Sequence, residues 1–184
     1  MDRITEFQEE HPSLESYWRS IILFGRNVAS YKFALAEALT ELVSSGKSSV
    51  TLNELAEPYS KHLCERLKTA SRQATSNSSK FIQSCREYNA GKITYDQLIA
   101  TTVKLGFNNV IDAFHHVNGG ILPVKFYEKD YSGSFKRIDM LPLWWQFYFL
   151  LSLIGGAYQN SFCYSHFSFM RTLSQYSLMI LYME

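Results

Sequence analysis

Apolar residues recur at helical spacing through most of the first 120 positions of the chain. Between Leu14 and Val43 they form a broad stripe on one side of a predicted helix. The stripe consists of Trp18, Ile21, Ile22, Val28, Ala29, Phe33, Ala36 and Leu39. Ser13 is placed to cap this helix, Gly25 marks a break or a close helix contact, and Gly46 ends the pattern.

A capping box predicts where the next helix begins. Thr51 and Glu54 have the spacing at which each side chain bonds the other residue's backbone amide, so a helix should run from about Leu52 to about Ala70. Pro58 should kink this helix or split off a short first piece. The Ser/Thr/Asn-rich stretch 69–80 that follows is typical of a loop.

Three shorter helices are predicted after that loop. One runs from Lys80 to Tyr88 and stops before Gly91. A second capping box, Thr94-Tyr95-Asp96-Gln97, opens a helix to Leu105 with Gly106 just beyond its end. Asn108 is placed to cap another helix, which should extend through Val117 to the Gly119-Gly120 pair.

The helical spacing of apolar residues ends before the segment 124–138. This segment predicts either a short β-hairpin or a loop, because aromatic residues flank the polar run Asp130-Tyr131-Ser132-Gly133-Ser134. The whole pattern predicts a mainly α fold. We expect a five- to six-helix orthogonal bundle, followed by an aromatic, apolar C-terminal segment.

Charge divides the chain into two parts. The 184 residues carry 18 basic and 17 acidic side chains, and the hydrophobic fraction of 46% excludes a disordered chain. Residues 138–184, however, contain only Asp139, Arg171 and Glu184 as charged groups, and 140–170 contain none. We therefore expect a helical domain over 1–137 and a tail of different origin or environment over 138–184.

Basic side chains are concentrated between Lys61 and Lys92, a segment that contains seven Lys or Arg residues and only two glutamates. Together with the neighbouring hydroxyl and amide groups, they suit the oxygens of a phosphate backbone. The alternative is a solvated helix face with its loop. The candidate nucleic-acid-binding residues are Lys61, Arg66, Lys68, Arg72, Lys80 and Arg86.

A second polar group falls in the run 106–116. On a continuous helix, Asn109, Asp112 and His116 would share one face, and Asp112 would reach His115. An Asp–His pair is able to act as a general base or as half of a metal site. No further Glu, Cys or His motif completes it, so a structural polar cap is the favoured interpretation.

Three widely spaced cysteines, Cys64, Cys85 and Cys163, form no C-x-x-C pair. This set predicts neither a disulfide framework nor a structural zinc site, and favours buried thiols in a reducing, cytoplasmic environment. The N-terminus has no basic segment followed by an apolar one, so it does not have the pattern of a signal peptide.

Three runs of the chain resemble a known family. They are Trp18–Ala36, Ser78–Phe81 and Leu105–His115. Each is similar to the opening region of bacterial HNH-endonuclease-domain proteins, and the resemblance covers roughly Leu14 to Ile138. It implies a helical N-terminal region that, in complete members, precedes a ββα-metal module holding a divalent ion.

The chain departs from that family after Ile138. Cys163 and His166 are the only cysteine and histidine there, and Asp139 and Glu184 the only carboxylates. No catalytic residue, metal ligand or cofactor site is therefore carried over from the resemblance, and no small-molecule substrate is evident.

The uncharged tail has three possible interpretations. It is out of frame after a frameshift near Ile138, or a buried helix that closes the core, or a membrane anchor over residues 141–158. That 18-residue stretch would span about 27 Å as a helix, close to the thickness of a hydrocarbon core. The change of charge density where the resemblance stops favours the first interpretation.

These observations predict the non-catalytic N-terminal portion of an HNH-type DNA endonuclease, truncated or frameshifted, that binds DNA or another protein through its basic surface. The alternative is a small protein anchored to the inner membrane, with its body binding a partner. DNA affinity that falls with salt and with charge reversal at Arg72 and Lys80 would favour the first hypothesis.

Overall fold

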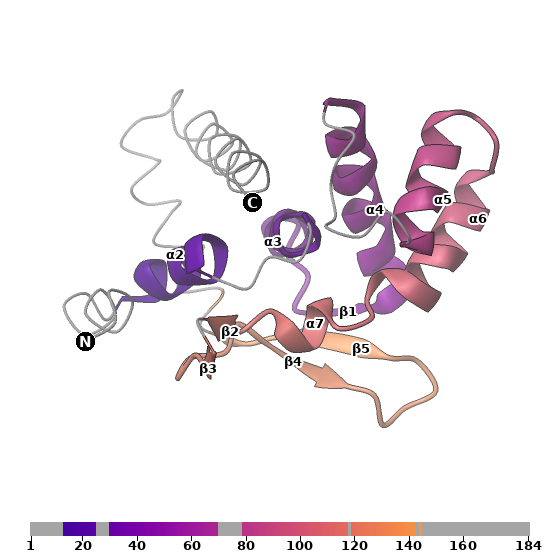
Figure 1. The fold of residues 1–184 in the computed structure, drawn as a ribbon. Helices are drawn as coiled ribbons and strands as arrows, with labels where there is room; N and C mark the ends of the chain where they lie inside the picture. The colour runs from indigo at the N-terminus through magenta and orange to yellow at the C-terminus, as the bar shows by residue number, and fades with distance from the viewer. Residues whose placement is uncertain (1–12, 25–29, 70–78, 118, 143, 145–184) are drawn as a thin grey trace.

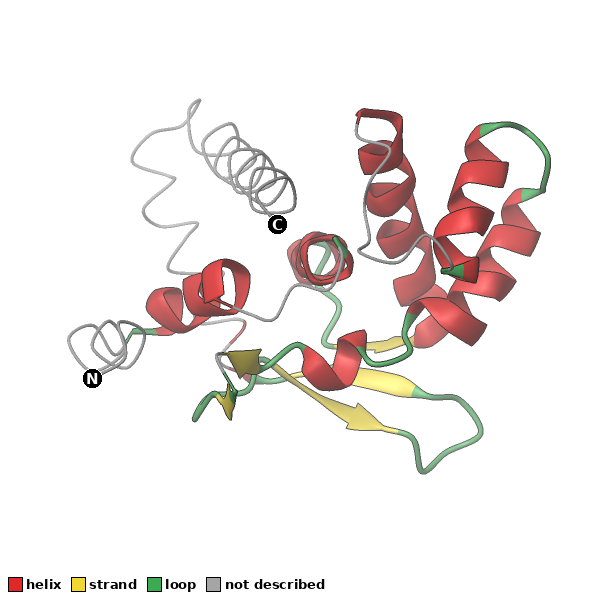
Figure 2. Ribbon diagram, in the orientation of Figure 1, coloured by secondary structure: helices red, strands yellow, loops and turns green. Residues whose placement is uncertain are grey.

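The computed structural model describes residues 13–24, 30–69, 79–117, 119–142 and 144. Helices α4, α5 and α6 lie side by side, α3 is seen nearly end-on beside them, and the strands run beneath (Figure 1). Helices are the main component, and a small antiparallel sheet accompanies them (Figure 2). The predicted mainly α fold is confirmed, whereas the orthogonal bundle stays a prediction.

The first apolar stripe forms two helices, α2 (Leu14–Phe24) and α3 (Tyr31–Ser44). Every member of the stripe that the structure describes is buried, while Val28 and Ala29 lie outside the described residues. Ser13 caps α2 as predicted, since its Oγ accepts a hydrogen bond from the backbone N–H of Ser16 at 3.1 Å.

Helix α4 (Leu52–Thr69) begins with the predicted capping box. The Thr51 N–H donates to the Glu54 carboxylate at 2.9 Å, and the Glu54 N–H donates to Thr51 Oγ1 at 3.2 Å. The hydrogen bond from Lys47 Nζ to the Glu54 carboxylate, together with those from the backbone N–H and the hydroxyl of Thr51, lowers the pKa of Glu54 to about 2. The helix continues through Pro58, which is buried within it.

The next elements are α5 (Lys80–Asn89), α6 (Tyr95–Thr101) and the π-helical turn η1 (Thr102–Gly106). The predicted capping box at Thr94 and Gln97 is present. The expectation for Gly106 was wrong, because this residue ends a π-turn packed against α5. A Cβ at Gly106 would lie 3.0 Å from the Phe81 ring, so the close approach of η1 to α5 requires glycine.

The helix expected through Val117 is much shorter than predicted. Helix α7 spans only Val110–Ala113, and Asn109 rather than Asn108 precedes it, with a φ of 68°. The prediction failed because β2 (His116–Val117) pairs with β3 (Gly120–Ile121). Gly119, with a φ of 84°, lies between the two strands, and Gly120 begins β3 rather than ending a helix.

The predicted hairpin after residue 124 is confirmed. Strands β4 (Tyr127–Asp130) and β5 (Arg137–Met140) pair antiparallel, and β1 (Ser49–Thr51) adds to β5, so the sheet order is β1-β5-β4. Tyr127, Ile138 and Met140 are buried on one face of this sheet.

The start of the C-terminal segment belongs to the core. The expected domain boundary at 137/138 falls inside β5, which bonds to strands on both sides. Trp144 is fully buried, and its ring centroid lies 4.5 Å from that of Trp18 and 5.5 Å from that of Phe126. Residues 145–184 lie outside the described residues, and so does most of the 141–158 stretch.

Candidate nucleic-acid interface

The parallel packing of α4 and α5 decides where the predicted basic residues lie. Asn89 at the end of α5 donates to the carbonyl oxygen of Cys64 at 2.8 Å. At the other end, the Phe81 ring stacks on the Tyr59 ring with centroids 5.7 Å apart. Lys80 is therefore at the opposite end of the helix pair from the last turns of both helices.

Arg66 is occupied by structural contacts. Its guanidinium donates to the Glu37 carboxylate at 2.8 Å, and its Cζ lies 5.7 Å from the centre of the Phe33 ring. Only 12% of its side chain is exposed. The same carboxylate faces the His62 ring, so Arg66 joins α4 to α3 and is not placed to meet a ligand.

The remaining predicted cations separate into two groups. Lys68 is exposed and Arg86 half-buried, and they occupy the last turns of α4 and α5. Lys61 is exposed further back on α4, with its Nζ 4.0 Å from the Glu41 carboxylate. Arg72 lies outside the described residues.

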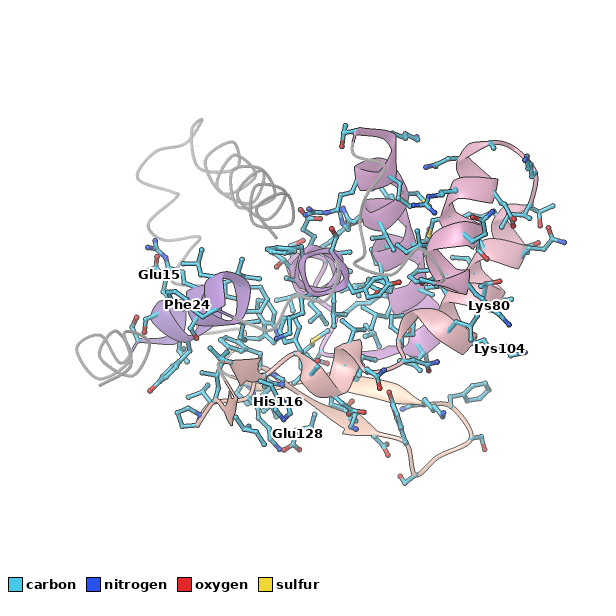
Figure 3. The ribbon with its side chains drawn as sticks, viewed as in Figure 1. Glu15, Phe24, Lys80, Lys104, His116 and Glu128 are labelled. Carbon is cyan, nitrogen blue, oxygen red and sulfur yellow. The ribbon has the colours of Figure 1, made fainter. Side chains whose placement is uncertain are left out.

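The other end of the helix pair carries Lys80 and a lysine that the sequence prediction missed, Lys104. Both are exposed, Lys80 as the first residue of α5 and Lys104 on η1, which packs against α5. Figure 3 places the two labels close together at one edge of the molecule. Within the described part of the chain, neither lysine has a carboxylate within 4.0 Å.

The first turn of α5 adds an electrostatic field that favours an anion at this end of the helix pair. Ser79 Oγ accepts the N–H of Ile82 at 3.3 Å and lies 2.6 Å from the Tyr31 hydroxyl, which fixes the helix start on α3. The remaining free amides and the helix dipole make the N-terminus of a helix favourable for anions. Lys80 and Lys104 reinforce that polarity. We call these two lysines, with the start of α5, the basic end.

The predicted polar cluster does not assemble. Asp112 is exposed and forms a salt bridge with Lys129, while the backbone carbonyl of Asp112 lies 3.0 Å from Nδ1 of His116. His115 is buried, and its Nε2 accepts the backbone N–H of Phe126 at 3.0 Å. Because α7 ends at residue 113, Asn109 does not share a helical face with these groups, and the proposed Asp112–His115 pair does not form.

Burial sets the protonation of His115 and of a second group that the sequence prediction missed. Burial, with smaller contributions from Lys125, Lys32 and His116, lowers the pKa of His115 to about 4. Lys32 is also buried, and its Nζ donates to the carbonyl oxygen of His116 at 2.8 Å. Burial lowers the pKa of Lys32 to about 8. Both groups link α3, the α7 region and the sheet, which is a structural role.

The two described cysteines are buried, as predicted, at the interface of α4 and α5. The thiol of Cys64 lies 3.9 Å from the carbonyl oxygen of Cys85. Cys163 lies outside the described residues.

Two other classes of site find no support in the described ranges. No group of three His, Cys, Asp or Glu side chains there is arranged to hold a metal ion. None of the helices in those ranges is both long and apolar enough to cross a bilayer.

Comparisons with known proteins add no relative. No protein family, curated protein or solved structure shows significant similarity to this chain.

Proposed function

We propose that this chain is a non-catalytic nucleic-acid-binding module that contacts the DNA phosphate backbone through the basic end. The observation that carries the proposal is the placement of Lys80 and Lys104 beside the first turn of α5, with no carboxylate of the described residues in ion-pair distance. Ammonium groups and helix N-termini are the groups that proteins use to bind phosphate oxygens.

Lys80 and Lys104 differ from Lys61 and Arg66 in having no carboxylate of the described residues within 4.0 Å, a property that the exposed Lys68 shares at the other end of the helix pair. Lys61 and Arg66 are each close to a glutamate, so a phosphate would have to compete with an existing partner. Lys80 and Lys104 would instead release only water and condensed counterions when they bind.

The proposed role agrees with the resemblance to the N-terminal region of HNH endonucleases. A helical region that precedes a nuclease module is able to hold the substrate backbone while another module cuts it. Two exposed lysines at the start of α5 and on η1 support a role in binding phosphate.

Fluorescence anisotropy with a labelled 20-base-pair DNA duplex at low salt tests this proposal. The double variant Lys80→Glu and Lys104→Glu should weaken binding by tenfold or more, since each lost phosphate contact contributes about 1 kcal/mol or more at low ionic strength.

A matched control keeps the change in net charge and moves its position. Arg19→Glu with Lys47→Glu also reverses two cations, one exposed and one half-buried, but each already pairs with a glutamate away from the basic end. Equal weakening in both double variants would show a nonspecific effect of net charge. Absence of any binding by the unaltered chain would exclude the proposed function.

A further inference from the structure

The turn between β4 and β5 has a composition that folding alone does not explain. Six residues join the strands, Tyr131-Ser132-Gly133-Ser134-Phe135-Lys136. The turn projects away from the helices in the ribbon view (Figure 1). Tyr131 is 40% exposed and Phe135 63% exposed. Exposed aromatic rings at such a tip leave apolar area in water, and a turn of this kind needs only Ser, Gly and Asp to form.

The turn is nevertheless held firmly at its base. Asp130 Oδ1 accepts the backbone N–H of Ser132 at 3.0 Å, which shapes the first half of the turn. At the other side, the carbonyl oxygen of Lys136 accepts the N–H of Leu52, the first residue of α4, at 3.0 Å. The two aromatic residues therefore sit on an anchored support, and ordering them for a ligand would cost little further entropy.

Two cations lie close to the Tyr131 ring. The Nζ atoms of Lys129 and Lys136 lie 5.6 and 5.2 Å from the centre of the Tyr131 ring. Arg137 is also exposed. Residues 129–137 therefore contain three cations, of which Lys129 forms a salt bridge with Asp112, and one carboxylate, Asp130. Exposed aromatic faces combined with cations are the chemistry by which proteins bind single-stranded nucleic acid, because every base has a face that stacks and every nucleotide has a phosphate.

Acidic groups limit where a strand would lie. Glu128 and Asp139 are directly opposite each other on β4 and β5, on the face of the sheet away from the core. Two carboxylates at this spacing repel a phosphate backbone. A bound single strand of DNA would therefore contact the tip of the turn and avoid this face of the β-sheet. Figure 3 labels Lys80 and Lys104 toward the same side of the view as this turn.

We propose that the β4–β5 turn stacks bases of single-stranded DNA on Phe135 and Tyr131, while Lys136 and Arg137 contact the adjoining phosphates. This inference rests on the proposed function, because it assumes that the chain binds nucleic acid. It adds that the chain prefers unpaired bases at this position, which the basic end alone would not provide.

The test compares single-stranded and duplex DNA on the full chain. Phe135→Ala should raise the Kd for a labelled oligothymidylate about 5- to 100-fold, which corresponds to the loss of one base stacked on an aromatic ring. Phe135→Trp should preserve the affinity. The Kd for duplex DNA should change less than twofold in both variants. Lys136→Gln should lower the salt slope for single-stranded DNA by about 0.7.

A spectroscopic readout separates stacking from electrostatic attraction. An oligonucleotide with 2-aminopurine should change its fluorescence on binding to the unaltered chain and to Phe135→Trp. The change should be smaller when the oligonucleotide is bound at saturation to Phe135→Ala, in which only Tyr131 is left to stack. Ile121→Ala is the matched control, since Ile121 is 64% exposed and lies in β3 rather than in the turn. This control should leave both the Kd and the fluorescence change unaltered.

The outcomes distinguish this inference from the proposed function. If Lys80→Glu with Lys104→Glu weakens DNA binding while Phe135→Ala leaves single-strand affinity and fluorescence unchanged, stacking at the turn is refuted and the proposed function stands. If Phe135→Ala weakens single-strand binding while the lysine variant has no effect, the turn is the binding site and the basic end is not. No binding of either DNA would overturn both.

Discussion

Trp144 offers a direct test of whether the core extends beyond residue 138. Its side chain is fully buried, with ring centroids at 4.5 Å from Trp18 and 5.5 Å from Phe126. Replacing it by alanine would remove two edge-to-face ring contacts and leave a cavity between α2 and the segment that follows β5. Large-to-small changes of this kind cost about 3–5 kcal/mol in the free energy of unfolding.

Urea denaturation followed by far-UV circular dichroism measures this loss. With an m-value of about 2 kcal/mol/M, Trp144→Ala should lower the urea midpoint by about 2 M and leave m unchanged. Ile121→Ala serves as the control, because this exposed side chain should change stability by less than about 0.5 kcal/mol. A loss below about 1 kcal/mol for Trp144→Ala would refute our assignment of Trp144 to the core.

Three further predictions concern buried or crowded positions. The unfolded His115 takes up a proton near pH 6.5 and the folded one only near pH 4, so stability should fall by up to about 3 kcal/mol as pH drops through this window. His115→Gln should remove that part of the pH dependence, and an unchanged acid profile in urea titrations would contradict it. For Lys32, with a folded pKa of about 8, the unfolded state binds more protons above pH 8, so stability should gain from rising pH up to about pH 10. Lys32→Met should lack this gain, and equal slopes in the two proteins would refute the assignment. Gly106→Ala should lower the free energy of unfolding by about 1–3 kcal/mol, because the added Cβ would press against the Phe81 ring. An unchanged thermal unfolding midpoint would show that η1 accommodates the Cβ without strain.

Local signals in the sequence predicted the helices well where capping and periodicity agree. The capping boxes at Thr51 and Thr94 and the cap at Ser13 each mark a real helix start, because their hydrogen bonds form between residues three apart. The glycines at 46 and 91 end helices with positive φ for the same local reason.

Long-range pairing explains what the sequence did not predict. Strand β1 is only three residues long, and its partner β5 lies far along the chain, so no local pattern marks it. The run after Asn109 has helical spacing, but pairing of His116–Val117 with Gly120–Ile121 stops the helix early. Tertiary contact overrode local preference there.

The candidate site was predicted in part. The sequence indicated the basic character of α4 and α5, but it did not indicate the parallel packing that separates Lys80 from Lys68. Lys104 was missed because it follows the basic segment in sequence and joins Lys80 only through the packing of η1 on α5. A carboxylate partner on α3 removed Arg66 from the site, which composition within one segment does not show.

The salt dependence of DNA binding tests the central claim most directly. A plot of log Kd against log salt concentration for the full chain and a duplex should have a slope of at least about 1.8, from two phosphate contacts at about 0.9 each. In Lys80→Gln with Lys104→Gln the slope should fall by about 1.8. The same slope in the variant as in the unaltered chain would contradict the assignment of the basic end as the DNA contact.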